Sequence, residues 1–293
     1  MSDMQFSVQF FGLPADQYLP LAIRAEQLGF HTLWLADHVV TPLDYDKVYP
    51  YNSAGDPGYR AETPLTDVAV TLGFLAGRTE RIRLGAGVFV LPMRNPFHVA
   101  RSFAALQNLS GGRLTLGLGT GWMREEFEAV GVPFRRRGDR TDEMLEVLDL
   151  LWSGRPVEYH GKFIDFPSVH FAGAPEQPIP YVFGGHSPAA LRRAARVGSG
   201  WFGPNLDLAA TAELTGQIDA ERGRLGRTGD FTHYVRLVGD LTPETVDRYA
   251  GAGFRHLVFA PFNRPDIPPT LAGRLAALDE AASGLGLAPA AVS

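Results

Sequence analysis

The 293-residue chain is 45% hydrophobic and 20% charged, and its net charge of −5 gives no general attraction to nucleic acid or anionic membranes. It contains no cysteine, which excludes disulfides, thiolate metal sites and cysteine nucleophiles. No apolar run approaches the roughly 20 residues of a membrane span and no secretory signal is visible, so we expect a soluble, cytoplasmic protein.

A unit made of a helix, a glycine stop and a short apolar strand recurs along the chain. Its clearest copies are 24–36 and 249–260, in which Gly29-Phe30 and Gly253-Phe254 separate the helix from the strand. Glycine is the usual residue at a helix stop, and a near-continuous apolar strand implies burial on both faces. Eight strands are predicted, near residues 5–11, 32–36, 82–88, 114–118, 181–184, 201–202, 232–237 and 256–260.

Helices are predicted between these strands, at about 15–28, 64–77, 96–110, 138–153, 187–197, 207–224, 242–250 and 268–283. Alternation of strands and helices indicates a parallel sheet with helical crossovers. Eight such units favour an α/β fold of the (β/α)8 TIM barrel type, which at this length forms one domain over residues 1–293. An open sheet of seven or eight strands is the alternative, because the sixth and seventh strands are weak.

Three connections are too long to be simple turns. Residues 39–63 follow the second strand and residues 122–138 follow the fourth, at the strand ends where barrel enzymes build their sites. Residues 155–180 precede the fifth strand, and within them the segment 158–166 predicts a small hairpin that turns at His160-Gly161. We therefore predict a barrel with insertions after strands two and four and before strand five.

Two segments nearly match known motifs, and each departs from its motif at one decisive residue. The segment 117–122 begins like a dinucleotide fingerprint, but Trp122 occupies the third glycine position. The segment 185–189 nearly matches the nucleophile elbow of serine hydrolases, in which the residue after the serine donates its N–H to the oxyanion. Pro188 follows Ser187 and has no N–H. The eight histidines show no metal-ligand spacing, so no metal site is predicted.

The turn at 184–188 is better suited to an anion. Glycine at 184 and 185 allows close backbone approach, Ser187 can cap the following helix, and Pro188 fits its first position. The free N–H groups of a helix N-terminus attract phosphate. An ordinary capped helix is the alternative interpretation.

Polar residues also follow the second and third strands on the same face. Asp37-His38 could hold a ring or transfer a proton, or else Asp37 caps local backbone and His38 is a satisfied loop residue. Gly87-Val88 ends the third strand, where glycine often marks a close approach to the backbone, although packing at the barrel rim would also explain it.

The fourth strand ends with an aromatic side chain and is followed by a basic run. Trp122, after Gly119-Thr120-Gly121, could stack on a planar ring or pack in a lid. The segment Arg135-Arg136-Arg137 is either a solvated loop or a group of cations that attracts an anion.

An ordered set of short segments, spread over nearly the whole chain, carries a resemblance to a known family. The segments are 25–30, 34–38, 84–88, 95–96, Leu106, 111–114, 119–122, 126–127, 140–143, 159–163 and 184–195. As an ordered set they resemble the bacterial luciferase-like monooxygenase superfamily, and more closely its branch that depends on the deazaflavin coenzyme F420. The resemblance implies a (β/α)8 barrel, a homodimer, and a flavin or deazaflavin ring over the barrel mouth.

The resemblance also implies roles for individual residues. Asp37 and His38 would lie beside the ring, and Gly87-Val88 would match a bulge behind it, where many relatives have a cis peptide bond before a residue other than proline. The turn at 184–187 would bind phosphate. Sugar-phosphate dehydrogenases of this branch have a catalytic glutamate directly after Gly-Thr-Gly, and this chain has Trp122 there.

We therefore expect a flavin-type oxidoreductase that transfers hydride to or from a small organic substrate with coenzyme F420, and with His38 as the catalytic residue. Alternatives are an FMN-dependent monooxygenase that uses molecular oxygen, a non-catalytic flavin-binding barrel, and a barrel enzyme without redox chemistry. The predicted cofactor-binding residues are Asp37, His38, Gly87, Val88, Gly119, Thr120, Gly184, Gly185, His186 and Ser187.

Overall fold

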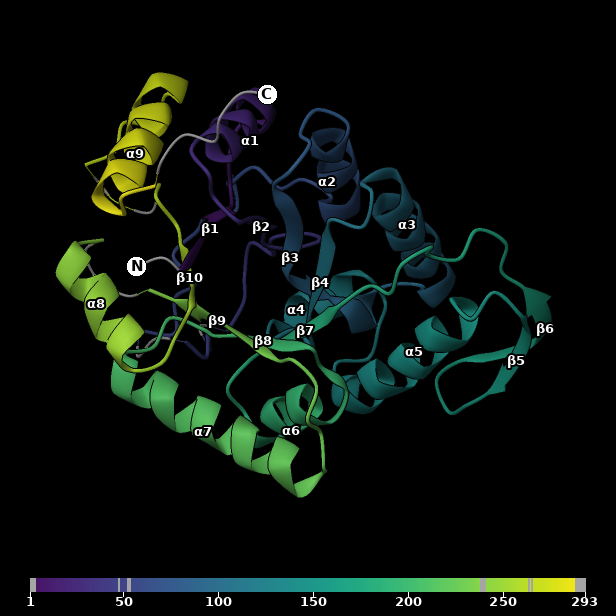
Figure 1. Cartoon of the computed structure of the whole chain (residues 1–293). Coiled ribbons are helices and arrows are strands. Elements are labelled where there is room, and N and C mark those ends of the chain that lie inside the picture. The colour runs from purple at the N-terminus through teal and green to yellow at the C-terminus, as the bar shows by residue number, and fades with distance from the viewer. Residues whose placement is uncertain are drawn as a thin grey trace.

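The computed structural model describes residues 4–46, 48–51, 54–237, 241–262, 264 and 266–287 (Figure 1). Eight parallel strands close into a barrel, which confirms the predicted architecture. In chain order they are β1 (Gln5–Phe10), β2 (Thr32–Leu35), β3 (Arg83–Val90), β4 (Leu114–Gly119), β7 (Tyr181–Gly184), β8 (Gly200–Phe202), β9 (Thr232–Arg236) and β10 (His256–Phe259). Around the barrel their order is β1-β10-β9-β8-β7-β4-β3-β2, so strands that follow one another in the chain pair with one another.

One long helix follows each barrel strand, and these helices surround the strands (Figure 1). They are α1 (Tyr18–Gln27), α2 (Val68–Ala76), α3 (Pro96–Leu109), α5 (Arg137–Leu151), α6 (Pro188–Val197), α7 (Leu208–Arg224), α8 (Pro243–Gly251) and α9 (Leu271–Gly284). Two short elements were not predicted, because each is too short to give an amphipathic pattern: η2 (Leu91–Met93) and α4 (Arg124–Ala129). The predicted helix at 15–28 begins with a 3₁₀ turn, η1 (Ala15–Gln17). Within the described ranges, no helix has the length and apolar character needed to cross a membrane.

Two helix starts at the barrel mouth are fixed by side-chain caps, and the one at Ser187 was predicted. The Asn95 Oδ1 atom accepts a hydrogen bond from the Phe97 N–H at 2.9 Å, with proline at the first position of α3. The Ser187 Oγ atom accepts from the Ala190 N–H at 3.3 Å, with Pro188 at the first position of α6. Capping satisfies N–H groups that a helix cannot pair internally.

The predicted hairpin is present as β5 (Pro156–His160) paired antiparallel with β6 (Asp165–His170). It lies outside the barrel, next to α5 (Figure 1). The Glu143 carboxylate of α5 accepts hydrogen bonds from the N–H groups of Lys162, Phe163 and Ile164 at 3.1, 2.7 and 2.7 Å. These contacts attach the hairpin to the helix that follows β4.

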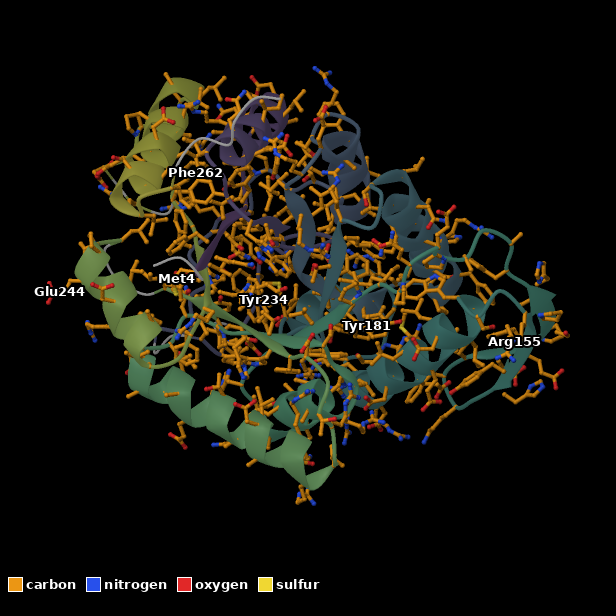
Figure 2. All side chains as sticks on the ribbon, in the orientation of Figure 1. Met4, Arg155, Tyr181, Tyr234, Glu244 and Phe262 are labelled. Carbon is orange, nitrogen blue, oxygen red and sulfur yellow. The ribbon has the colours of Figure 1, made fainter. Side chains whose placement is uncertain are left out.

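Large aromatic side chains fill the barrel interior beneath its mouth. Tyr234 lies near the centre of the molecule in Figure 2, and its ring centroid is 4.9 Å from that of the fully buried Trp34. Phe202 packs on the same indole at 4.8 Å. A Cβ atom on Gly85 would lie 2.3 Å from the indole, so this glycine is what leaves room for it. The barrel is therefore a packed core and not a pore.

Two imidazoles lie at the opposite, N-terminal end of the barrel strands. His31 precedes β2, His256 begins β10, and their ring centroids are 5.7 Å apart. Burial, and then the charges of His256 and Arg83, together lower the pKa of His31 from its ordinary value of 6.5 to about 4. The folded chain therefore holds fewer protons than the unfolded chain between these two pH values.

This difference predicts a loss of stability in mild acid. In this pH range His31 is protonated in the unfolded state and neutral in the folded state. The free energy of unfolding should therefore fall as the pH drops from about 7 to 5. At a partly screened imidazole we expect a contribution of about 1–2 kcal/mol. Urea unfolding at both pH values should show a smaller decline for a His31→Gln variant than for the wild type. Equal declines would remove His31 from the effect.

Candidate active site

A cavity of about 490 Å³ lies at the C-terminal ends of the barrel strands. Its wall combines the ends of all eight strands with residues of the connection between β2 and α2. Each of the predicted cofactor-binding residues lines this cavity: Asp37, His38, Gly87, Val88, Gly119, Thr120, Gly184, Gly185, His186 and Ser187. The fold thus brings into one cavity residues that are up to 150 positions apart in the chain, counting from 37 to 187.

The end of β3 forms one wall of the cavity. The Gly87–Val88 peptide bond is cis, and the Gln9 side-chain amide donates a hydrogen bond to the Gly87 carbonyl at 2.6 Å. A Cβ atom at Gly119 would lie 2.7 Å from a methyl carbon of Val88, and one at Gly184 would lie 2.9 Å from the other. Glycines at the ends of β4 and β7 therefore leave the room that the Val88 side chain occupies in this wall.

The turn between β7 and α6 forms a second wall. Gly185 has a φ of +103°, and a Cβ atom there would lie 3.1 Å from the Ala190 Cβ atom. The Trp201 indole donates to the Gly185 carbonyl at 2.8 Å, which fixes the turn from beneath. His186 lies next to it, and its Nδ1 atom is buried with no hydrogen-bond partner in the described part of the chain. The turn therefore presents a helix N-terminus to the cavity, as an anion site requires.

Arg137, at the start of α5, also lines the cavity. Its Nε atom donates to the Gly121 carbonyl at 2.9 Å, and its guanidinium lies 3.8 Å from the centroid of the Phe134 ring. Arg193, in the middle of α6, donates to the Gly138 carbonyl at 3.1 Å, so α6 contacts the start of α5. Of the predicted basic run, Arg137 lies at the cavity, whereas Arg136 pairs with Asp139 on the surface.

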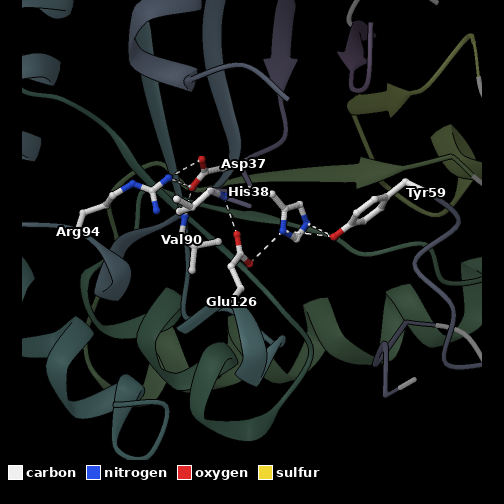
Figure 3. Close-up of polar contacts among 7 residues, drawn as sticks. Asp37, His38, Tyr59, Val90, Arg94 and Glu126 are labelled. Carbon is white, nitrogen blue, oxygen red and sulfur yellow. Dashed lines mark hydrogen bonds and ion pairs between the residues drawn. The ribbon is translucent and has the colours of Figure 1, made fainter. Parts of the chain in front are cut away.

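His38 lies between two partners in the cavity (Figure 3). Its Nδ1 atom is 3.1 Å from Glu126 Oε2, and its Nε2 atom is 3.1 Å from the Tyr59 hydroxyl. The other Glu126 oxygen accepts the Val39 N–H at 2.5 Å. The Glu126 side chain is 3% exposed, so a buried carboxylate from α4 fixes both the ring and the adjacent backbone. Both ring nitrogens of His38 thus have partners, as in the interpretation of a satisfied loop residue. The ring also lines the cavity.

Asp37 faces the other way, toward β3 and η2 (Figure 3). Its carboxylate accepts hydrogen bonds from Arg94 at 2.8 and 3.1 Å and from the Val90 N–H at 2.9 Å. Burial raises the pKa of this carboxyl, and the Arg94 charge opposes that rise. Both carboxylate oxygens of Asp37 thus accept hydrogen bonds. Asp37 therefore ties the segment that carries His38 to the end of β3 and to Arg94.

Several cavity residues were not among the predicted site residues. Tyr49, Tyr51 and Tyr59 belong to the connection after β2, and Arg236 ends β9. Trp122 lines the cavity and also packs against Tyr49, with ring centroids 5.2 Å apart, so both of its predicted roles are compatible with its position. The sequence offered no periodic signal for the tyrosines, although their density between 45 and 59 is unusual.

The chain is similar to known proteins in sequence. The sequence profile of the luciferase-like monooxygenases matches residues 12–283. An uncharacterised protein of Mycobacterium tuberculosis (strain ATCC 25618 / H37Rv) is 35% identical over 241 residues, which cover 82% of this chain and 83% of the relative. An F420-dependent glucose-6-phosphate dehydrogenase of Kineococcus radiotolerans is 30% identical over 243 residues, 78% of this chain and 67% of the relative.

The fold is also that of a solved structure. An F420-dependent secondary alcohol dehydrogenase in complex with an F420–acetone adduct superposes with a TM-score of 0.76, over 95% of this chain and 98% of the other. The two sequences are 17% identical, so this likeness concerns the fold alone.

Proposed function

Because the chain belongs to the luciferase-like monooxygenase family and is an oxidoreductase of the flavin or deazaflavin type, we propose that it uses coenzyme F420 to transfer hydride to or from a small organic substrate. The F420-dependent dehydrogenase among its relatives supports this choice of cofactor. The observation that carries the proposal is that one cavity combines a glycine-rich wall beside Gly87-Val88 with a turn that opens a helix N-terminus.

The cavity fits a cofactor of this class in two ways. A flat ring can approach the backbone at Gly87-Val88, because Gly119 and Gly184 carry no side chains there. The phosphate that such cofactors carry would meet the N–H groups at the start of α6 and the guanidinium of Arg137. When bound, the cofactor supplies the hydride-transfer chemistry, and the protein supplies orientation, anchoring and exclusion of water.

The proton that accompanies hydride transfer would be handled by His38. Glu126 holds the imidazole through Nδ1, which leaves Nε2 directed at the Tyr59 hydroxyl. Burial, and then the nearby Glu126 charge, raise the pKa of Tyr59, so that this phenol keeps its proton at neutral pH. His38 and Tyr59 together therefore hold a proton beside the cavity, where a positioned side chain can deliver it.

Cofactor titration tests the proposal directly. Ring fluorescence should change when the purified protein is titrated with F420, and FMN should bind more weakly. Tight binding of FMN with no response to F420 would overturn the proposal and favour an FMN-dependent monooxygenase, the second candidate that the family supports. A cofactor that binds but never turns over, whichever reductant and acceptor are supplied, would indicate a non-catalytic flavin-binding barrel.

We also propose that the protein forms a homodimer through α2 and α3. Val70 and Phe74 lie one turn apart on α2 and are 72% and 53% exposed, and Leu109 at the end of α3 is 83% exposed. The two helices are neighbours on the barrel surface. Exposed apolar residues that gather on adjacent helices are typical of an interface.

A charged residue on this surface should separate the subunits. Phe74→Asp is expected to give a monomer in light scattering at micromolar concentration, where the wild type is a dimer, because an unpaired carboxylate is costly in an apolar contact. An Asp placed at the exposed Leu225 of the barrel's far side should leave the dimer intact. A wild type that is itself monomeric would refute the assignment.

A further inference from the structure

Arg236 is a cation in the cavity wall whose charge is not compensated. It ends β9, and its guanidinium makes no hydrogen bond or ion pair with any residue in the described part of the chain. Its ionisable neighbour is Tyr49, whose pKa is raised by burial, so that the phenol is neutral and cannot balance the charge. Burial lowers the pKa of Arg236 itself, but a guanidinium stays protonated in proteins.

The other charged groups of the cavity have an assignment. Asp37 pairs with Arg94, and Glu126 contacts His38. Arg137 donates to the Gly121 carbonyl, lies over the Phe134 ring, and is assigned to the cofactor phosphate by the proposed function. Arg236 is partly buried in the cavity wall, and an unpaired cation in such a place favours an anion, which the described residues do not supply.

The barrel places Arg236 on the substrate side of the proposed cofactor. In the strand order around the barrel, β9 is four strands from β3 in either direction, so Arg236 lies across the mouth from Gly87-Val88. A ring that rests on Gly87-Val88 turns its other face toward Arg236. The phosphate turn after β7 is two strands from β9, which separates the two anion sites.

Aromatic side chains line the cavity that Arg236 faces, and Tyr49 is the one closest to its charge. The rings of Phe11 and Tyr59 are in contact, with centroids 5.1 Å apart, and Tyr49 packs on Trp122 at 5.2 Å. These four residues line the same cavity as Arg236. Rings of this kind provide apolar faces for a hydrocarbon or aromatic body, and the guanidinium provides a fork that matches an oxyanion.

We infer that the substrate is a small organic anion, a carboxylate or phosphate on an apolar or aromatic body, and that Arg236 binds its anionic group. The inference rests on the proposed function, since it assigns the substrate class of the same cavity. Arg236 is thus a specificity-determining residue and takes no part in proton transfer.

Calorimetric titration of the full-length protein with benzoate, phenyl phosphate and neutral benzamide tests the inference. At least one anion should bind about tenfold or more tightly than benzamide, as expected for a charge-assisted pair. The tighter of the two anions identifies the group as a carboxylate or a phosphate. Arg236→Met should abolish the preference for that anion over benzamide, and Arg236→Lys should retain part of it.

Arg137→Met is the matched control, because it removes the other guanidinium that lines the cavity. It should weaken F420 binding and leave the preference for the anion, whereas Arg236→Met should do the reverse. Equal affinity of the wild type for all three probes would overturn the inference. An Arg236→Met protein that still prefers the anion to benzamide but no longer binds F420 would also overturn it. A wild type that binds neither F420 nor FMN would refute the proposed function, and the anion preference is still read without cofactor.

Discussion

Replacement of His38 by alanine is expected to lower kcat by about 10²- to 10⁴-fold, the usual effect of removing a general acid or base. The imidazole faces the cavity and lies within 3.1 Å of both Glu126 and Tyr59. Stability should change far less, by about 1–2 kcal/mol, because Glu126 keeps its hydrogen bond to the Val39 N–H. The measurements are steady-state oxidation of reduced F420 with an acceptor that the wild type turns over, and urea unfolding of both proteins.

Two further variants separate the roles within this group. Tyr59→Phe removes the hydroxyl and keeps the ring contact with Phe11, so it should reduce kcat without loosening the cavity. Glu126→Gln keeps the shape of the side chain and removes the charge beside Nδ1. A His38→Ala enzyme with unchanged kcat would remove His38 from the mechanism.

Replacement of Gly185 by valine is expected to weaken F420 binding by about 100-fold or more. The residue has a φ of +103°, which a β-branched residue adopts only at high cost, and a new Cβ atom would lie 3.1 Å from Ala190 Cβ. The turn would have to move, and with it the N–H groups that face the proposed phosphate. Losing two hydrogen bonds to a charged group costs about 3 kcal/mol or more, which corresponds to that factor.

Gly216→Ala provides the control for this substitution. Gly216 lies within α7, and a Cβ atom there would meet nothing within 4 Å. This variant should bind F420 like the wild type and be slightly more stable, by about 0.5–1 kcal/mol, because alanine is the better helix former. Undiminished binding of F420 by Gly185→Val would show that the turn does not hold the phosphate.

The sequence permitted the prediction of the barrel because each strand carries its own local signal. Even β8, which has three residues, was found from Trp201-Phe202 after a glycine. The candidate cofactor residues were found for the same reason: they follow strands directly, and the ends of parallel strands meet at one face of a barrel. Gly185 and Ser187 needed only the strand–turn–helix pattern.

The remaining cavity residues depend on contacts that no local pattern encodes. Tyr59 reaches His38 from within a connection that has no regular periodicity, and Glu126 reaches it from a helix of six residues. Without the orientation of that helix, Glu125 and Glu126 could not be told apart. Arg236 ends a strand like its neighbours, and its importance comes from the absence of a described partner, which only three-dimensional structure reveals.

The two oxygens of Glu126 have different tasks, and this has a kinetic consequence. One accepts the Val39 N–H at the beginning of the connection that covers the cavity, and the other contacts the imidazole of His38. Movement of that connection away from the barrel would break the first contact and disturb the second. Admission of substrate and readiness for proton delivery would then alternate in time.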